Sequence, residues 1–337
     1  MANWYDLNGS LLTVDAAFPA LEEPLQIYLG ELRTDRRASA PDYTIRIDSG
    51  PPREVPAEAQ LLHEGPLPEA PVCRLSGDDT RRWFVIPERI SLEFSTSERV
   101  AQMTVAPGHE RLAGATAAIN ALYAALFVTG QTLVHAAALR LPRQNSAFVL
   151  FAPSGAGKTT TSLALALQGF GLLTDDATVL TGTGTSASDT LVWGLPRPPK
   201  VHRKTAAMLP EIGRLLGSKW NEEDEQSLAP AALRSVGEVE PGRSYPLRAL
   251  VLLGQRVTGP HVLKPMRKAD LFVHFATDNV ARAPQGVLSD DLARFNRFVA
   301  LVAKTPAYEL NVGSDLSTLG EAIAREFGTA DQPILSA

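Results

Sequence analysis

A short glycine-rich stretch carries the residue types and spacing that bind phosphate. It follows the GxxxxGK[ST] pattern with alanine in the first place, through Ala152, Pro153, Ser154, Gly155, Ala156, Gly157, Lys158 and Thr159. Small residues let consecutive backbone N–H groups approach phosphate oxygens closely. Lys158 would reach the β- and γ-phosphates, and the Thr159 hydroxyl would hold Mg²⁺. The stretch predicts a nucleoside triphosphate site, which we expect to bind ATP through residues 153 to 160, Thr160 included.

The sequence around this motif predicts the strand and the helix that a phosphate-binding loop requires. Residues 147–151 are apolar and rich in aromatic or β-branched types, which is typical of a buried strand. The run LALALQG after the motif has helical periodicity and good helix formers, so the loop would lie at a positive helix N-terminus. Such turns also occur in proteins that bind no phosphate, but a Lys-Thr pair at this place is rare by accident.

Two adjacent carboxylates follow the next predicted strand, 172–174. Asp175 and Asp176 come sixteen and seventeen positions after Thr159, so a helix returning along the sheet would bring them beside the loop. One carboxylate would hold the metal with Thr159, and the other would act as a base. The alternative is a pair of aspartates that only cap a helix or form a turn.

Three further groups have residue types that suit phosphoryl transfer. His135 lies on a predicted strand next to 147–151 and would orient a carboxylate or sit near the γ-phosphate. Arg243, in a Pro-Gly-Arg turn, is placed where a cation could stabilise the transition state. The segment Lys200, His202, Arg203 and Lys204 is basic and would contact a substrate. A structural histidine, a surface arginine and a solvated loop are the competing interpretations.

In combination, these residues resemble a known family. The segments VHAAA at 134–138, SGAGKTT at 154–160 and GFGLLTDDATVL at 169–180, with the later Pro-Gly-Arg, are similar to the catalytic domain of HPr kinase/phosphorylase. They are more similar still to HPr-kinase-related kinases of peptide-modifying gene clusters, including those that phosphorylate lasso-peptide precursors. The resemblance covers about 111–327.

The resemblance implies a role for each matching residue. Asp175 would be the base and His135 would orient it, while Asp176 and Thr159 would hold Mg²⁺. Lys158 would bind the phosphates and Arg243 the developing charge. The sequence departs from the family at Ala152, Thr159 and Thr160, and it has no convincing match to the segment linked to phosphorolysis. These departures argue against phosphorolysis and against HPr as the substrate.

Composition limits the partners. The chain has 337 residues, 45% of them hydrophobic and 20% charged, which is ordinary for a soluble globular protein. The net charge of −5 gives no basic field for nucleic acid. With one cysteine there is no disulfide framework, and no signal-peptide or membrane-spanning pattern is visible. We therefore expect a cytoplasmic protein with no membrane and no nucleic-acid partner; the resemblance adds a possible homo-oligomer.

The expected fold is α/β: an HPr-kinase/PEP-carboxykinase-like phosphate-loop core with a mixed sheet and flanking helices, preceded by a β-rich N-terminal domain. The predicted divisions are 1–106, 107–330 and a tail at 331–337. Strands are expected at 44–48, 83–86, 91–95, 132–141, 191–195 and 308–312, with paired strands at 247–253 and 261–266. Helices are expected at 111–130, 205–216, 268–275, 289–304 and 315–327, and a polar surface loop at 218–235.

The function expected from these features is a kinase that moves the γ-phosphate of ATP to a hydroxyl, with Mg²⁺, on a serine of a peptide or small protein. Two other classes are consistent with the same motif. One is a nucleotide-binding regulatory or scaffold protein without an acceptor, and the other is a small-molecule kinase. Likeness of fold does not identify the acceptor.

Overall fold

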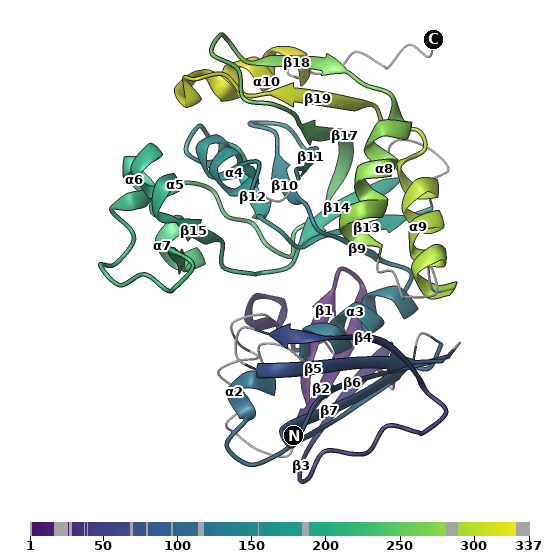
Figure 1. The fold of residues 1–337 in the computed structure, drawn as a ribbon. Helices are drawn as coiled ribbons and strands as arrows, with labels where there is room; N and C mark the ends of the chain where they lie inside the picture. Colours follow the sequence, from purple (N-terminus) through teal and green to yellow (C-terminus); the bar gives the residue numbers. More distant parts are fainter. Residues whose placement is uncertain are drawn as a thin grey trace. The chain divides into compact units, whose positions relative to one another are not determined.

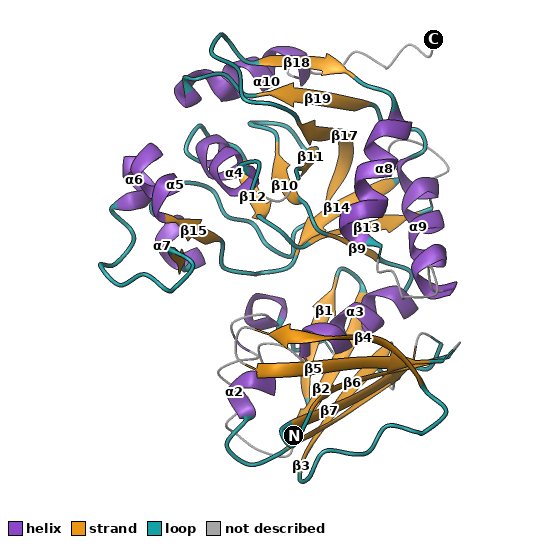
Figure 2. Cartoon of the chain, in the orientation of Figure 1, coloured by secondary structure: helices purple, strands orange, loops and turns teal. Residues whose placement is uncertain are grey.

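The structure is a computed structural model, and it describes residues 2–16, 26, 29–36, 38, 40–67, 70–78, 80–95, 97–113, 118–153, 155–183, 189–280 and 289–327. The chain divides into two compact units (Figures 1 and 2). The first contains 1–133 and 280–298, and the second contains 134–279 and 299–337. β9 (Thr132–Val134) and α9 (Ser289–Val302) each cross the boundary between them.

The first unit is built on one eight-stranded sheet. Its order is β1 (Asn3–Leu7), β2 (Ser10–Ala16), β3 (Tyr43–Ser49), β8 (Val100–Val105), β7 (Ile90–Ser95), β6 (Arg81–Ile86), β5 (Ala70–Gly77) and β4 (Gln60–Leu67). The β2–β3 and β3–β8 pairs are parallel, and the other neighbours are antiparallel. Alternate residues of β3, namely Tyr43, Ile45 and Ile47, are buried, as period-2 patterning requires.

A helix covers this sheet. α3 (Ala118–Val128) contacts β3, β7 and β8, so residues 107–133 group with the first unit, whereas the predicted division placed them with the phosphate loop. The shorter elements are η2 (Gly30–Leu32) and α2 (Glu110–Leu112). Cys73 is buried in β5, and burial raises the pKa of its thiol, which disfavours a role as a nucleophile.

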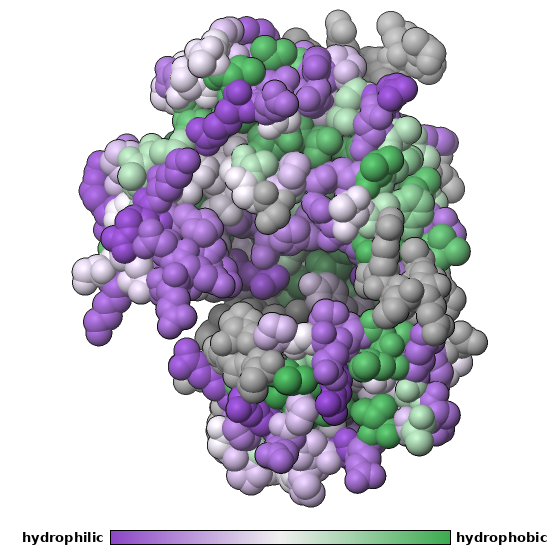
Figure 3. All heavy atoms as spheres, in the orientation of Figure 1, coloured by the Kyte–Doolittle hydropathy of each residue, from purple (hydrophilic) through white to green (hydrophobic). Residues whose placement is uncertain are grey.

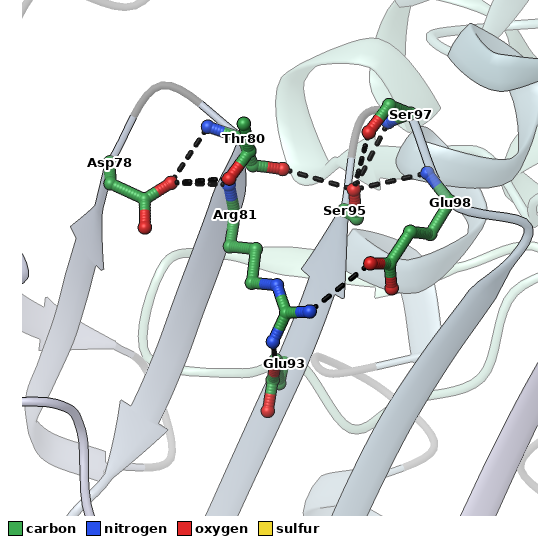
Figure 4. A network of polar contacts seen from close by, with 7 residues as sticks. All are labelled: Asp78, Thr80, Arg81, Glu93, Ser95, Ser97 and Glu98. Atoms are coloured by element: carbon green, nitrogen blue, oxygen red, sulfur yellow. Dashed lines mark hydrogen bonds and ion pairs between the residues drawn. The ribbon is translucent and has the colours of Figure 1, made fainter.

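A polar network fixes the strand ends at one side of this sheet (Figure 4). An Asp78 carboxylate oxygen accepts hydrogen bonds from the Thr80 and Arg81 N–H groups, each at 2.7 Å. Arg81 in turn forms ion pairs with Glu93 at 2.7 Å and Glu98 at 3.1 Å. These contacts join the turn before β6 to β7 and to the connection that leads into β8. Their role is structural.

The second unit has a mixed sheet. Its order includes β12 (Gly171–Thr174), β10 (Ala137–Arg140), β11 (Ala147–Phe151), β17 (Tyr245–Leu253), β14 (Thr190–Gly194) and β13 (Thr178–Gly182). β19 (Ala307–Asn311) pairs with β17, and β18 (Val262–Pro265) pairs with β19. β11, β17 and β19 are parallel, while β10–β11, β10–β12 and β14–β17 are antiparallel.

Helices and a small hairpin complete this unit. They are α4 (Lys158–Ala166), α5 (Arg203–Met208), α6 (Pro210–Gly213), α7 (Pro230–Leu233), α8 (Lys268–Asn279), η4 (Leu316–Thr318) and α10 (Leu319–Phe327), with β15 (Lys200–His202) paired to β16 (Glu225–Ser227). α4 contacts β10, β11 and β12, while α10 contacts β18. Mixed sheets with helices, and a β-rich N-terminal part, confirm the α/β expectation at this level.

β11 lies between β10 and β17 in the sheet of the second unit and is buried on both faces. Phe148 and Leu150 belong to a core with Leu163 of α4, and the Phe148 ring lies 6.2 Å from that of Phe170. On the other face, the Phe151 ring lies 6.5 Å from that of Phe275 in α8. Burial on both sides explains the continuous apolar run that predicted this strand.

Several predicted elements differ in the structure. The strand expected over 132–141 is two strands, because the chain bends at His135 and Ala136. The strands expected at 247–253 and 261–266 do not pair directly; β19 lies between them. The expected loop at 218–235 contains β16 and α7. The expected tail at 331–337 lies outside the described residues. No described helix has both the length and the apolar character to cross a bilayer.

Candidate functional site

The turn between β11 and α4 has a backbone that only glycine adopts easily. Gly155 and Gly157 have φ of +75° and +101°, in the left-handed region that is strained for other residues. Gly157 is the N-cap of α4 and no side chain caps this helix start. The first N–H groups of a helix have no partner within the helix, so here they are available to an anion. Ser154 lies outside the described residues.

A cavity of about 520 Å³ opens at this turn, within the range of small-molecule sites (about 300–1,000 Å³). Its lining includes nearly all the residues predicted from the sequence: His135, Pro153, Gly155, Ala156, Gly157, Lys158, Thr159, Thr160, Asp175, Asp176, Lys200, His202 and Arg203. Residues separated by up to 68 positions thus meet in one place. Of the predicted residues that the structure describes, Arg243 is outside this lining.

Asp175 is buried, and both of its carboxylate oxygens accept hydrogen bonds from hydroxyl groups. It follows the last residue of β12 and is 5% exposed. Thr159 Oγ1 donates to one carboxylate oxygen at 2.7 Å, and Ser162 Oγ donates to the other at 2.5 Å. Burial raises the pKa of this carboxyl, although the two hydroxyl donors and Lys158 oppose the shift. Asp175 therefore fixes the Thr159 side chain rather than facing open solvent.

Asp176 is more accessible than its neighbour. Its side chain is 33% exposed, and one oxygen lies 3.3 Å from Arg197 Nη1. Ser162 and Arg197 were not predicted as site residues. Ser162 lies three positions after Thr159 on the same helix face, a spacing that could have suggested it. Arg197 lies in an irregular Pro-Arg-Pro segment, where the sequence has no periodicity to use.

His135 contacts the lysine of the turn. Its Nε2 atom lies 3.2 Å from Lys158 Nζ, and its backbone N–H donates to the Asn279 side chain. Desolvation, and after it the Lys158 charge, lowers the pKa of His135, which favours a neutral ring at pH 7. An ammonium group can only donate, so Nε2 accepts and Nδ1 carries the proton. The prediction that His135 orients Asp175 has no matching hydrogen bond between the two.

The predicted substrate-binding cations are largely paired. Glu225 on β16 lies 2.9 Å from His202 Nε2 and 3.8 Å from Lys200 Nζ. Arg203 Nε donates to Asp224 at 2.8 Å, and its guanidinium lies 4.7 Å from the centre of the Trp220 ring. Figure 3 shows hydrophilic side chains gathered over this part of the surface, around β15 and α5. These pairs hold β15 and β16 together and reduce the net positive charge of this wall.

Arg243 belongs to a different cluster. Its Nη1 atom donates to Glu240 at 3.2 Å, and its side chain is 70% exposed. Glu240 also binds Arg140 at 2.8 Å and accepts from the Tyr245 hydroxyl at 3.1 Å. The turn expected to direct Arg243 to the phosphates instead directs it to Glu240, three residues earlier.

One cation that sequence reasoning missed lines the cavity. Arg256 follows β17, and its Nη2 atom would lie 3.6 Å from a Cβ built on Gly157. In the described part of the chain, no cluster of three or more His, Cys, Asp or Glu residues is placed to hold a metal. The Thr159 hydroxyl, which donates to Asp175, lies beside the turn, and this suits Mg²⁺ because the ion takes few protein ligands and binds phosphate oxygens.

Comparison with known proteins adds little. No protein-family model matches the chain, and no curated protein matches it. Among solved structures, the chain is similar to the HPr(Ser) kinase/phosphatase from Coxiella burnetii, with 10% identity and a TM-score of 0.29. That match covers 58% of this chain and 95% of the other. At such a TM-score the likeness carries no argument about the function of this chain.

Proposed function

We propose that this protein is a kinase that transfers the γ-phosphate of ATP to a hydroxyl group, and that the acceptor is a serine of a peptide or small protein. The observation that carries the proposal is the meeting of Lys158, Thr159 and two aspartates around one cavity at an uncapped helix start. Backbone N–H groups and Lys158 would bind the phosphates. A carboxylate pair beside them supports transfer in addition to binding.

The different exposure of the two aspartates favours exchanging the roles predicted from the sequence. Asp175 is occupied by the Thr159 and Ser162 hydroxyls, so it would hold the Thr159 oxygen toward the metal. Asp176 is exposed to the cavity and would accept the proton of the hydroxyl. When bound, Mg²⁺ would neutralise negative charge on the phosphate oxygens.

The proposed reaction uses this placement. The acceptor oxygen forms a bond to the γ-phosphorus while the bond from that phosphorus to the β–γ bridging oxygen breaks. The hydroxyl proton passes to the Asp176 carboxylate, and ADP leaves. His135 holds the Lys158 ammonium group through Nε2, which limits the positions that this cation can adopt.

The test is transfer of label from γ-labelled ATP, with Mg²⁺, into a peptide library that has serine fixed at one position. We expect the wild type to label serine and Asp176→Asn to slow transfer by about 10²–10⁴-fold, the usual contribution of a positioned base. Asp270→Asn is the matched control because Asp270 is bound to Arg267 and does not line the cavity. Release of all the label as inorganic phosphate would contradict the proposal, as would wild-type transfer by Asp176→Asn.

A further inference from the structure

We propose that Arg256 is a second cation for the phosphate chain, beside Lys158 in the cavity lining, and contacts the chain next to Gly157. This inference rests on the proposed function, because it names a further residue of the same site. It assigns to Arg256 the kind of contact that the sequence suggested for Arg243.

The sheet brings Arg256 to the phosphate-binding turn. β11 and β17 are parallel neighbours, with Phe151 opposite Leu252 at their ends. The carboxyl ends of parallel strands lie at the same edge of a sheet, which is where such sheets bind ligands. β11 continues into the turn at 152–157, and β17 continues into the segment 254–257. The two segments therefore leave the sheet side by side.

The backbone on both sides of Arg256 is held by hydrogen bonds. The N–H groups of Gly254 and Gln255 donate to the Leu310 carbonyl and to the Asn311 side chain, both at 2.9 Å. The Val257 N–H donates to the Val312 carbonyl, also at 2.9 Å. The backbone that carries the arginine is thus already ordered, so it loses little conformational entropy when the side chain binds a ligand.

The guanidinium group is available to a ligand. Two other cations of the lining have acidic partners: Arg203 Nε lies 2.8 Å from Asp224, and Lys200 Nζ forms a longer ion pair with Glu225 at 3.8 Å. Arg256 is exposed, and within the described residues no hydrogen bond or ion pair engages it. The guanidinium group lies next to Gly157, since a Cβ built there would be 3.6 Å from Nη2, an ordinary contact distance.

This position suits a chain of phosphates. Arg256 and Lys158 line the same cavity beside one helix start, so an anion with several charges could contact both cations. A guanidinium group presents a planar fork that can bind two oxygens at once. Arg256 would therefore bind the phosphate chain itself, independently of the base and ribose.

The experiment compares the Kd of Mg·ATP and of inorganic tripolyphosphate by calorimetry. We expect Arg256→Ala to weaken both ligands by the same factor, about 10–100-fold, as for the loss of a charge-assisted hydrogen bond. Arg256→Lys should recover part of the loss because the charge remains without the fork. Arg325→Ala, which removes an exposed arginine of α10 outside the cavity lining, should leave both Kd values unchanged.

The outcomes separate the inference from the function on which it rests. Wild-type affinity in Arg256→Ala, or a loss for ATP without a loss for tripolyphosphate, overturns the role of Arg256 and leaves the kinase proposal standing. A wild-type protein that binds neither ligand overturns both. Arg256→Gln provides a second neutral variant if Arg256→Ala does not fold.

Discussion

At the residue scale, the buried, charged carboxylate of Asp175 lowers the stability of the folded protein. Its pKa is raised, chiefly by burial, above the value of an unfolded chain. As the pH rises, the Asp175 carboxyl therefore loses its proton at a lower pH in the unfolded state than in the folded state. The contribution of Asp175 to folding stability is present below the ordinary aspartate pKa and is lost as the pH rises through the raised folded value.

This predicts that Asp175→Asn stabilises the protein at neutral pH and impairs transfer. The amide is neutral, keeps an oxygen for a hydroxyl donor, and does not carry the buried charge. A gain of about 1 kcal/mol would raise Tm by about 2–4 °C. The measurement is Tm of both proteins from pH 7 to pH 4, where the difference should shrink as the wild-type carboxyl becomes protonated. A variant less stable than wild type at pH 7 would show that the two hydroxyl bonds to the charge outweigh its burial.

At the scale of elements, α4 and α5 are joined by one buried hydrogen bond. Thr160 Oγ1 and Thr205 Oγ1 are 2.8 Å apart, and both residues are buried. The sequence predicted Thr160 as a nucleotide-binding residue. Its hydroxyl instead contacts α5, the helix that follows β15, so only its backbone N–H remains for a phosphate.

We therefore predict that Thr160→Val lowers stability but keeps nucleotide affinity. Valine has the same shape, and it leaves the Thr205 hydroxyl buried without this partner, at a cost of about 1–2 kcal/mol. Urea unfolding should show a lower midpoint with an unchanged m-value, while the Kd of ATP changes less than about threefold. Thr277→Val, at an exposed hydroxyl on α8, should stay within about 0.5 kcal/mol of wild type. A tenfold loss of ATP affinity in Thr160→Val at unchanged stability would place the hydroxyl on the nucleotide.

The local parts of the site could be predicted from the sequence because they lie in one strand, one turn and one helix. The apolar run at 147–151 and the glycines at 155 and 157 specify their own conformations. Arg256 could not be found in this way, because its position depends on β17 lying parallel to β11, a pairing across about a hundred residues. The β15–β16 pair was missed because both strands are short and polar, with no apolar alternation to indicate them.

At the scale of the whole molecule, the chain forms two compact units, and the described residues of the candidate site belong to the second. Every described residue that lines the cavity belongs to the second unit. A ligand that binds only the folded state suppresses local opening around its own site. We therefore predict that nucleotide slows amide hydrogen exchange around the site in the second unit and leaves the exchange rates of the strands in the first sheet unchanged.

Amide hydrogen exchange with and without Mg·ATP tests the central claim most directly. The account predicts slower exchange for the N–H groups of 155–160 and of 254–257, and no change in the strands β1 to β8. Lys158→Ala should abolish this protection at the same ATP concentration. Unchanged exchange at 155–160 in a protein shown to bind ATP, or protection confined to the first sheet, would contradict the account, because the nucleotide would then bind elsewhere.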